Sequence, residues 1–416
     1  MKKIIVQKFG GTSVGSVERI RAVADICIQT KEKEDCELVV VVSAMGDTTD
    51  DLIDLMDGVT RGVTNPPPLR EYDMLLSAGE QISMALLAMA LENSGQKARS
   101  MTGWQAGIQT SSVHQKARIG EIKTENLLKA LSEGIIPVVA GFQGISQDQQ
   151  ITTLGRGGSD TSAVALAVAL KAERCDIYTD VDSVHTTDPR MVKEVGDIKF
   201  ITYDEMLELA SLGAQVLHPR SVEIARNYNM PLRVRSSWKP ENEGTLVIKK
   251  VDEMIEGQRT VRGVALDRKH ARLSIIGVPD EPGIAYKIFG QLADRGVSID
   301  IIVQCVSHDG QTELDFTVNA NEADKAKKEL DEIAKQIKAK STSLDKKIVK
   351  VSAVGAGMID QPGVAAKMFK ALADKEINIQ MISTSEIRIS CIVDEKQGEL
   401  AVKTIHDAFN LSEVKS

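Results

Sequence analysis

Two patterns of apolar and polar residues divide the chain near residue 245. In the first part, short apolar runs alternate with helical patterns and Gly-rich turns. The runs that predict buried strands are Ile4 to Val6, Leu38 to Val42, Ile135 to Ala140 and Cys175 to Tyr178. The helical patterns lie near residues 17–30, 70–93 and 160–172. Apolar strands alternating with helices predict an α/β domain over residues 1–245, with a mostly parallel sheet sandwiched by helices.

An internal repeat begins at about residue 260. The matching segments are Leu273–Gly277 with Val351–Gly355, and Pro282–Ala285 with Pro362–Ala365. Each copy predicts a strand, a Pro-Gly turn, a helix, two strands and a helix. We therefore predict two α+β units, residues 246–345 with the preceding linker and residues 346–416.

One predicted strand, Val261–Leu266, precedes the first unit, whereas the second unit is one strand short after its last helix at 396–409. We expect the spare strand to complete the second unit, so that the first unit is inserted within it. Pairing of this strand with residues 271–278 alone would contradict that hypothesis.

Composition narrows the class of protein. Of the 416 residues, 42% are apolar and 26% are charged, which is typical of a soluble globular chain. Aromatic residues are only 3% and the net charge is −8, so a nucleic-acid partner is disfavoured. The apolar run at the N-terminus is too short for a secretory signal, and we expect no segment that spans a bilayer.

The five cysteines are scattered and form no C-x-x-C pair. This pattern predicts buried or inert free thiols in a reducing cytoplasm. The six histidines include no H-x-H or H-E-x-x-H motif, so no zinc site is expected, and no direct metal ligand is assigned.

The first candidate for chemistry is Lys8–Val14, a Gly-rich segment after a strand. Glycines between a strand and a helix let phosphates approach backbone N–H groups, and Lys8 adds a positive charge. Since Lys8 precedes the glycines, the segment is not a G-x-x-x-x-G-K-[ST] loop. The alternative is a tight turn beside a solvated lysine.

The second candidate is Gly155–Thr161, at the start of an apolar helix. Ser159 or Asp160 can cap this helix. Arg156 offers two parallel N–H donors to a carboxylate or phosphate, and Asp160 can orient Lys8 or meet a metal–nucleotide.

Three further segments carry polar groups beside predicted strands or helices. They are Ser43–Thr49, Leu76–Glu80, and an acidic run from Ile177 to Asp182 that continues to Arg190. Each also has a structural explanation, as a polar turn, an exposed helix-start acid or a solvated loop. Gly355-Ala-Gly357 half resembles a dinucleotide turn, but it lacks the third glycine and its repeat copy lacks the pattern, so a dehydrogenase is disfavoured.

Taken together, the motifs resemble the aspartokinase family. The matching segments are Lys8–Ser13, Val42–Thr49, Met74–Glu80, Val139–Gly144, Thr152–Asp160 and Leu217–Glu223. The repeats look like tandem ACT domains, with Ser383–Ser390 as the tail motif. The resemblance implies an amino acid kinase fold followed by two ferredoxin-like ACT domains.

The resemblance also implies ATP-dependent phosphorylation of the side-chain carboxylate of L-aspartate to 4-phospho-L-aspartate, with Mg²⁺, on the route to lysine, threonine and methionine. An ionised carboxylate needs no general base, which is consistent with the absence of a Ser/His/Asp pattern. The open alternatives are a kinase of glutamate or N-acetylglutamate, and a non-catalytic amino-acid sensor.

The resemblance assigns roles by position. Lys8 and Asp160 are the expected catalytic residues. The expected ATP-binding residues are Lys8, Phe9, Gly10, Gly11, Ser13, Ser43, Tyr178, Thr179, Val184, Thr187, Asp188, Pro189 and Arg190. The expected aspartate-binding residues are Thr49, Glu80, Arg156, Gly157, Gly158 and Ser159, with Arg156 on the α-carboxylate and Glu80 on the ammonium.

Family analogy further implies feedback inhibition by lysine, threonine or both. The expected effector-binding residues are Asp280, Pro282, Gly283, Ile284, Ala285, Asp300, Gln304, Asn378 and Ile379. We expect a homodimer or higher oligomer through the ACT units. Met254 could start a separate regulatory chain, although an ordinary interdomain methionine is favoured.

Overall fold

The computed structural model describes residues 2–62, 67–212, 216–249, 260–305, 310–358 and 361–412. The chain divides into two compact units. An α/β unit comprises Met1–His185 and Asp197–Glu256, and an α+β unit comprises Thr186–Gly196 and Gly257–Ser416. Met254 lies outside the described residues, as does Asp360, which precedes the second Pro-Gly turn at Pro362 in the sequence.

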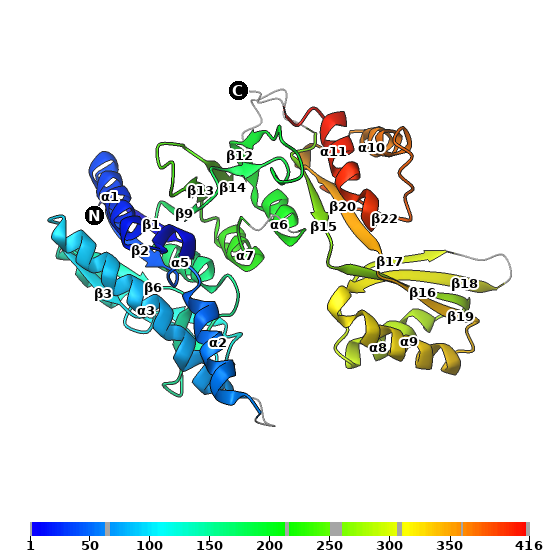
Figure 1. The fold of residues 1–416 in the computed structure, drawn as a ribbon, viewed down its shortest axis with the longest axis horizontal. Helices are drawn as coiled ribbons and strands as arrows, with labels where there is room; N and C mark the ends of the chain where they lie inside the picture. Colours follow the sequence, from blue (N-terminus) through cyan, green and yellow to red (C-terminus); the bar gives the residue numbers. More distant parts are fainter. Residues whose placement is uncertain are drawn as a thin grey trace. The chain divides into compact units, whose positions relative to one another are not determined.

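The α/β unit is built on an eight-stranded sheet of order β12-β14-β13-β9-β1-β2-β6-β3 (Figure 1). Its strands are β1 (Ile4–Phe9), β2 (Glu37–Val42), β3 (Ala98–Met101), β6 (Ile136–Ala140), β9 (Arg174–Thr179), β12 (Phe200–Thr202), β13 (Leu232–Ser236) and β14 (Thr245–Ile248). Only the β13–β14 pair is antiparallel among these neighbours. The four apolar runs found in the sequence are β9, β1, β2 and β6, which lie side by side, and the predicted fold class is confirmed.

Helices cover both faces of this sheet. The helices of this unit are α1 (Val17–Glu34), α2 (Thr48–Thr60), α3 (Leu69–Asn93), α4 (Glu125–Ser132), α5 (Gly158–Ala169), α6 (Tyr203–Ser211) and α7 (Pro219–Tyr228). Of these, α2 packs on α3 instead of on the sheet and has no buried residue. Ile5 and Phe9 of β1 share a core with α1 and α3. Successive side chains of a strand point to opposite faces, so Lys8 lies on the other face, where α5 contacts β1, β2 and β9.

A smaller sheet of order β5-β4-β7-β8 lies in the same unit. Its strands are β4 (Ile108–Thr110), β5 (Ile119–Ile122), β7 (Gln143–Ser146) and β8 (Ile151–Thr153). The two-stranded pair β10 (Val184–His185) and β11 (Asp197–Ile198) flanks residues 186–196.

Helix α3 is long and apolar enough to cross a membrane by length and composition alone, contrary to the sequence-based expectation. Half of its most apolar window is buried within the protein. The helix packs against β3, β6 and β8, and its buried face includes Asp73 and Glu80.

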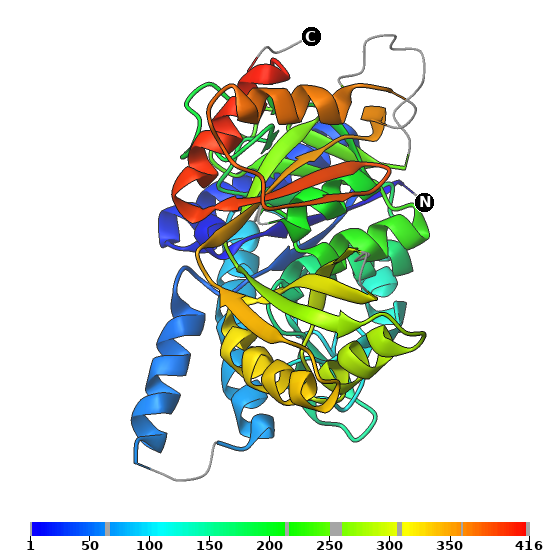
Figure 2. The ribbon, with the colours of Figure 1, turned by 90° about the vertical axis from the view of Figure 1, so that its right-hand side faces the viewer.

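The α+β unit contains two four-stranded antiparallel sheets, β17-β18-β16-β19 and β15-β20-β22-β21 (Figure 2). The strands are β15 (Gly263–Asp267), β16 (His270–Pro279), β17 (Ile299–Cys305), β18 (Gln311–Asn319), β19 (Ser341–Asp345), β20 (Ile348–Val354), β21 (Met381–Thr384) and β22 (Arg388–Asp394). The helices are α8 (Ile284–Asp294), α9 (Ala323–Gln336), α10 (Val364–Ala373) and α11 (Gly398–Ala408). β15 pairs with β20 in the second sheet, and the first sheet is formed from the chain between them.

Residues 186–196 leave the α/β unit and pack into the second half of the α+β unit. Val192 shares a core with α10 and α11. The hydroxyl of Thr186 lies 2.9 Å from Nε2 of the buried His406 on α11. The sequence analysis did not predict this placement, because it assigned Val184 and residues 187–190 together to one nucleotide-binding set.

All five cysteines are free. Cys27, Cys36, Cys175 and Cys391 are buried, as expected, whereas Cys305 is exposed. Burial raises the pKa of the Cys391 thiol to about 12, which makes it a poor nucleophile at neutral pH.

Charged side chains are paired at the amino ends of β9 and β13. Asp176 is fully buried and accepts hydrogen bonds from Arg174 at 2.9 Å and from Arg233 at 2.9 and 3.0 Å. Arg174 also pairs with Glu34 at the end of α1. The hydrogen bond from Arg174 lowers the pKa of Glu34 to about 2 from an ordinary value of 4.5.

We expect Glu34→Gln to lower the urea concentration at which the α/β unit unfolds at pH 7. A carboxyl whose pKa is lowered by folding stabilises the protein above its unfolded pKa, about 4.5, and this contribution is lost as the pH falls toward 2. The difference between variant and wild type should therefore shrink at pH 3. Glu32→Gln, on an exposed neighbour in α1, is the control. An equal difference at both pH values would contradict the assignment.

Candidate active site

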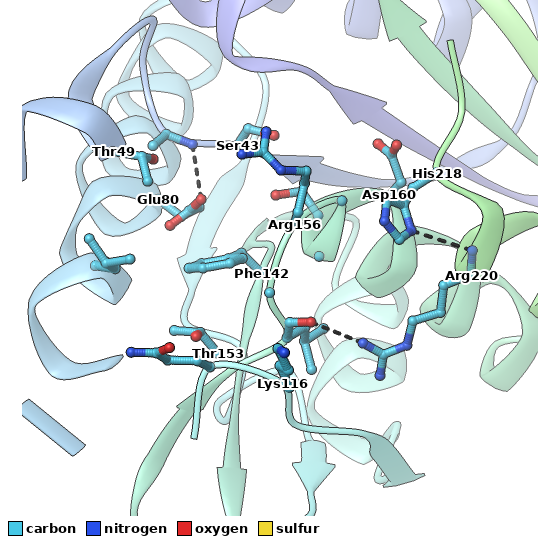
Figure 3. Close-up of a pocket in the computed structure, with 18 of the residues that line it drawn as sticks. Ser43, Thr49, Glu80, Lys116, Phe142, Thr153, Arg156, Asp160, His218 and Arg220 are labelled. Atoms are coloured by element: carbon cyan, nitrogen blue, oxygen red, sulfur yellow. Dashed lines mark hydrogen bonds between the residues drawn. The ribbon is translucent and has the colours of Figure 1, made fainter. Parts of the chain in front are cut away.

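A cavity of about 1130 Å³ opens where β1, β2 and β6 end, and it is bordered by α3, α5 and α7 (Figure 3). Parallel strands place their carboxyl ends along one edge of a sheet, which is where ligands bind in such folds. The sequence-predicted residues that line it are Lys8, Gly11, Ser43, Thr49, Glu80, Arg156, Gly157, Gly158, Ser159 and Asp160. Segments more than 140 residues apart in the chain thus meet at one cavity.

Lys8 and Asp160 form an ion pair at this cavity. Nζ of Lys8 lies 2.6 Å from Oδ1 of Asp160, and each residue is only 9% exposed. Lys8 is held by the ladder of β1, and Asp160 by the first turn of α5. The pair therefore fixes a positive charge at the sheet edge in partly dehydrated surroundings, where its field is stronger than in water.

The loops after β1 and β2 are joined by backbone hydrogen bonds. The N–H of Ser43 donates to the carbonyl of Phe9 at 3.1 Å, and that of Gly46 donates to Gly11 at 3.0 Å. A Cβ at position 11 would lie 3.0 Å from the Ala44 carbonyl. Glycine at position 11 thus allows the two loops to approach each other beside Lys8.

Glu80 is a buried acid with an unused acceptor. Its Oε1 accepts a hydrogen bond from the Ala44 N–H at 3.2 Å, whereas its Oε2 has no hydrogen-bond partner within the described chain. Burial raises the pKa of Glu80 to about 8. A buried carboxylate at a cavity with a free oxygen is a candidate partner for a ligand cation.

The loop 155–158 carries Arg156 to the cavity. Gly157 has a left-handed φ of 70°, and a Cβ there would lie 2.2 Å from the His218 ring, so only glycine fits. Arg156 is exposed and forms no ion pair with the part of the chain that the structure describes. Its guanidinium is thereby available to an anionic ligand.

The prediction that Ser159 or Asp160 caps α5 was wrong. Gly157 is the N-cap, and Ser159 and Asp160 belong to the first helical turn. The left-handed Gly157 starts the helix two residues earlier than the capping pattern suggests. Asp160 is free of a capping role and instead pairs with Lys8.

Several predicted nucleotide-binding residues do not line the cavity. The Phe9 and Tyr178 rings are fully buried and stack at 4.6 Å, so only their backbones could meet a ligand. The Tyr178 carbonyl accepts from the Gly10 N–H at 3.2 Å. Ser13 donates to Ser237.

Other residues of the predicted nucleotide set lie farther along the chain. Thr179 follows in β9, and Val184 is buried in β10. Thr187, Asp188, Pro189 and Arg190 belong to the α+β unit, where Arg190 pairs with Asp188.

Sequence reasoning assigned no role to several residues that line the cavity. They are Phe142, Gln115, Lys116, Arg118, His218 and Arg220. Phe142 has a left-handed φ of 67°, and its N–H donates to Ser162 of α5 at 3.0 Å. The family-like segments Val139–Gly144 and Leu217–Glu223 contain Phe142, His218 and Arg220. No segment that resembles the family was noted over residues 115–118.

The predicted effector turn lies at the start of α8. Gly283, with φ of 92°, is the N-cap of α8, and no side chain caps this end of the helix. The Asp280 N–H donates to Gly310 at 3.0 Å. Asp300 on β17 lies 2.5 Å from Nζ of the buried Lys350 on β20, so this acid joins the two sheets of the unit.

The chain matches known proteins along its length. Residues 3–236 match the amino acid kinase family, and residues 272–335 and 351–409 each match the ACT domain. An aspartate kinase of Pseudomonas fluorescens is 52% identical over 408 residues, covering 98% of both chains.

Two solved structures of E. coli aspartokinase III are also similar. The complex with aspartate and ADP, in the R-state, aligns with a TM-score of 0.80 at 26% identity, over 98% of this chain and 99% of that one. The complex with lysine and aspartate, in the T-state, aligns with a TM-score of 0.74 at 27% identity, over 99% and 100%.

Proposed function

The chain belongs to the aspartokinases, within the amino acid kinase family, and on this premise we propose that it transfers the γ-phosphoryl group of ATP to the side-chain carboxylate of L-aspartate. The product is 4-phospho-L-aspartate. The similar E. coli enzyme in complex with aspartate and ADP supports this pair of ligands.

The observation that carries the proposal is the convergence of Lys8, Arg156 and Glu80 on one cavity. Arg156 binds the α-carboxylate through two parallel N–H donors. The unpaired Oε2 of Glu80 receives the ammonium. Lys8 neutralises the β- and γ-phosphates, and Thr49 with Gly157, Gly158 and Ser159 completes the amino-acid pocket.

The reaction requires positioning and charge neutralisation. The acceptor carboxylate is already ionised at neutral pH, so an oxygen of it attacks the γ-phosphorus without a general base. The bond from the γ-phosphorus to the β–γ bridging oxygen breaks, and ADP leaves with that electron pair. Lys8, held by Asp160, stabilises the charge that builds on the transferring group.

The phosphates are proposed to lie along the loops after β1 and β2. The donors proposed to meet them are the Gly11 N–H and the Ser43 hydroxyl. Gly10 and Ser13, whose N–H groups donate to the Tyr178 and Gly10 carbonyls, shape the turn that carries these donors. The proposed nucleoside contacts in the α/β unit are Phe9, Tyr178, Thr179 and Val184, with Phe9 and Tyr178 limited to backbone contacts. For Thr187, Asp188, Pro189 and Arg190, which belong to the α+β unit, nucleotide binding stays a prediction from the resemblance.

Mg²⁺ enters the proposal as the ion that ATP brings with it. Hard phosphate oxygens and water are the ligands that Mg²⁺ prefers, and the ion neutralises part of the phosphate charge. Within the described ranges, no three His, Cys, Asp or Glu side chains form a metal-binding group.

The ACT units are proposed to bind lysine, threonine or both as inhibitors. The predicted effector site comprises the turn Asp280–Ala285, Asp300, Gln304, Asn378 and Ile379. The lysine complex of the E. coli T-state enzyme supports lysine as one effector. Association of two chains through their ACT units, and a cytoplasmic location, are part of the same proposal.

Lys8→Ala is expected to lower kcat by about 100-fold or more, because one fixed positive charge on the transferring group is lost. Hydroxamate trapping of the acyl phosphate, with aspartate and with glutamate as acceptors, measures it. Thermal unfolding of the variant checks that the fold is retained. Near-normal turnover by a folded Lys8→Ala protein would contradict the assignment, and preferential trapping with glutamate would contradict aspartate as the substrate.

The KM for aspartate is expected to rise as the pH falls below about 8. Burial raises the pKa of Glu80 to about 8, and Glu80 must be ionised to pair with the ammonium. Below pH 8 substrate binding must therefore also remove a proton from Glu80, and this free-energy cost weakens binding. The rise approaches tenfold per pH unit, and the KM for ATP does not share it. Glu80→Gln should raise this KM at pH 8.5 and abolish its pH dependence. A KM profile that Glu80→Gln leaves unchanged would refute this role.

Asp280→Ala is expected to weaken inhibition by lysine or threonine while kcat and both KM values without effector stay unchanged. The acid stands beside the uncapped start of α8, where an amino-acid effector can bind both N–H groups and the carboxylate. Inhibition curves for each effector measure the change. Asp294→Ala removes an exposed acid at the end of the same helix and is the control; lysine or threonine should inhibit this variant as strongly as they inhibit the wild type. Equal inhibition of both variants would contradict the proposed site.

A further inference from the structure

The buried face of α3 carries an acid that the proposed mechanism does not use. Polar residues follow this face at Asp73, Ser77, Glu80 and Ser83, all buried. Glu80 reaches Ala44, and the Ser83 hydroxyl donates to the Ser43 carbonyl at 2.6 Å. Glu80 and Ser83 therefore hold the loop after β2, and Asp73 lies on the same face of α3 about two turns before Glu80.

Asp73 is fully buried and accepts hydrogen bonds from three residues. Thr153 donates its hydroxyl to Oδ1 at 2.6 Å, and the Gln115 N–H lies 3.1 and 3.2 Å from the two oxygens. Nδ1 of His114 lies 2.6 Å from Oδ2. A carboxylate only accepts, so Nδ1 carries the proton of this bond.

The partners of Asp73 belong to two loops that line the aspartate side of the cavity. Gln115 begins loop 115–118, and Thr153 ends β8 two residues before Gly155. The loops touch: the Ala117 N–H donates to the Thr153 carbonyl at 3.0 Å. A Cβ at Gly155 would lie 2.7 Å from the Gln115 carbonyl oxygen.

Arg220 holds the same two loops from the side of α7. Its guanidinium donates to the Leu154 carbonyl at 3.0 Å and to the Ala117 carbonyl at 2.8 Å, the first of which is drawn in Figure 3. The chain that leads into Arg156 is thus fixed between a buried anion on α3 and a cation on α7. Gln115 has a left-handed φ of 64°, which the contacts of Asp73 help to maintain.

We propose that Asp73 is a positioning residue for aspartate binding: it fixes loops 115–118 and 153–156 so that Arg156 meets the substrate α-carboxylate. The inference rests on the proposed substrate role of Arg156. Asp73 does not itself touch the substrate. Its effect should fall on the amino acid and not on ATP, because the phosphate-binding loops after β1 and β2 are held by other bonds.

The test compares the KM for aspartate with the KM for ATP in Asp73→Asn. The amide keeps the shape but replaces one acceptor oxygen with a donor, which faces the donors of His114 and Gln115. We expect a KM for aspartate raised about tenfold or more, with the KM for ATP within twofold of wild type. Asp25→Asn, on an exposed acid of α1, should change neither.

Thr153→Val provides a milder variant should Asp73→Asn fail to fold. It removes one donor and leaves Asp73 its bonds to Gln115 and His114. A selective rise in the KM for aspartate, reversed in Thr153→Ser, is expected. Equal changes in both KM values, or a lower melting temperature with unchanged kinetics, would overturn the inference.

Arg156→Lys separates this inference from the proposed function. A double variant carries both Asp73→Asn and Arg156→Lys. If Asp73 acts through Arg156, the fold-rise in its KM for aspartate should be well below the product of the fold-rises in the two single variants. Fully multiplicative effects would overturn the positioning role while the substrate role of Arg156 stands. An unchanged KM for aspartate in Arg156→Lys alone would overturn the substrate role, and the inference with it.

Discussion

A parallel sheet aligns the carboxyl ends of its strands along one edge, and the site depends on this constraint. β1, β2 and β6 are neighbours in the sheet although β6 begins more than 90 residues after β2 ends. The end of β1 brings Lys8 to the cavity, and the loops after β2 and β6 bring Ser43 and Phe142. The helices that cover the sheet then supply Glu80 from one face and Asp160 from the other.

The same arrangement explains how several charges are buried at one place. Burying a charge is costly unless it is paired or hydrogen-bonded. Lys8 and Asp160 offset each other's cost, and Asp73 receives bonds from three residues. Glu80 is different, because burial leaves one of its oxygens unsatisfied and raises its pKa to about 8. A ligand cation stabilises the ionised form of Glu80, and below pH 8 part of this gain offsets the cost of removing its proton.

Local sequence patterns predicted four adjacent strands of the large sheet (β9, β1, β2 and β6), the helices α1, α3 and α5, and the residues whose chemistry lies next to a strand end. Lys8 with its glycines, and Arg156 with its glycines, are of this kind. Asp73 gave no signal, because its role arises from partners 41 to 80 positions away that only the fold brings together. The N-cap at Gly157 was mispredicted because a left-handed glycine decides it, which residue type alone does not show.

A crystal structure with L-aspartate and a non-hydrolysable ATP analogue would test the central claim most directly, namely that this cavity joins an amino-acid pocket to a phosphate-binding edge. The account predicts the substrate ammonium at Oε2 of Glu80, the α-carboxylate on Arg156, and the γ-phosphate within hydrogen-bond distance of Nζ of Lys8. Aspartate bound elsewhere, with Oε2 of Glu80 still unpaired and Lys8 held by Asp160 alone, would contradict it.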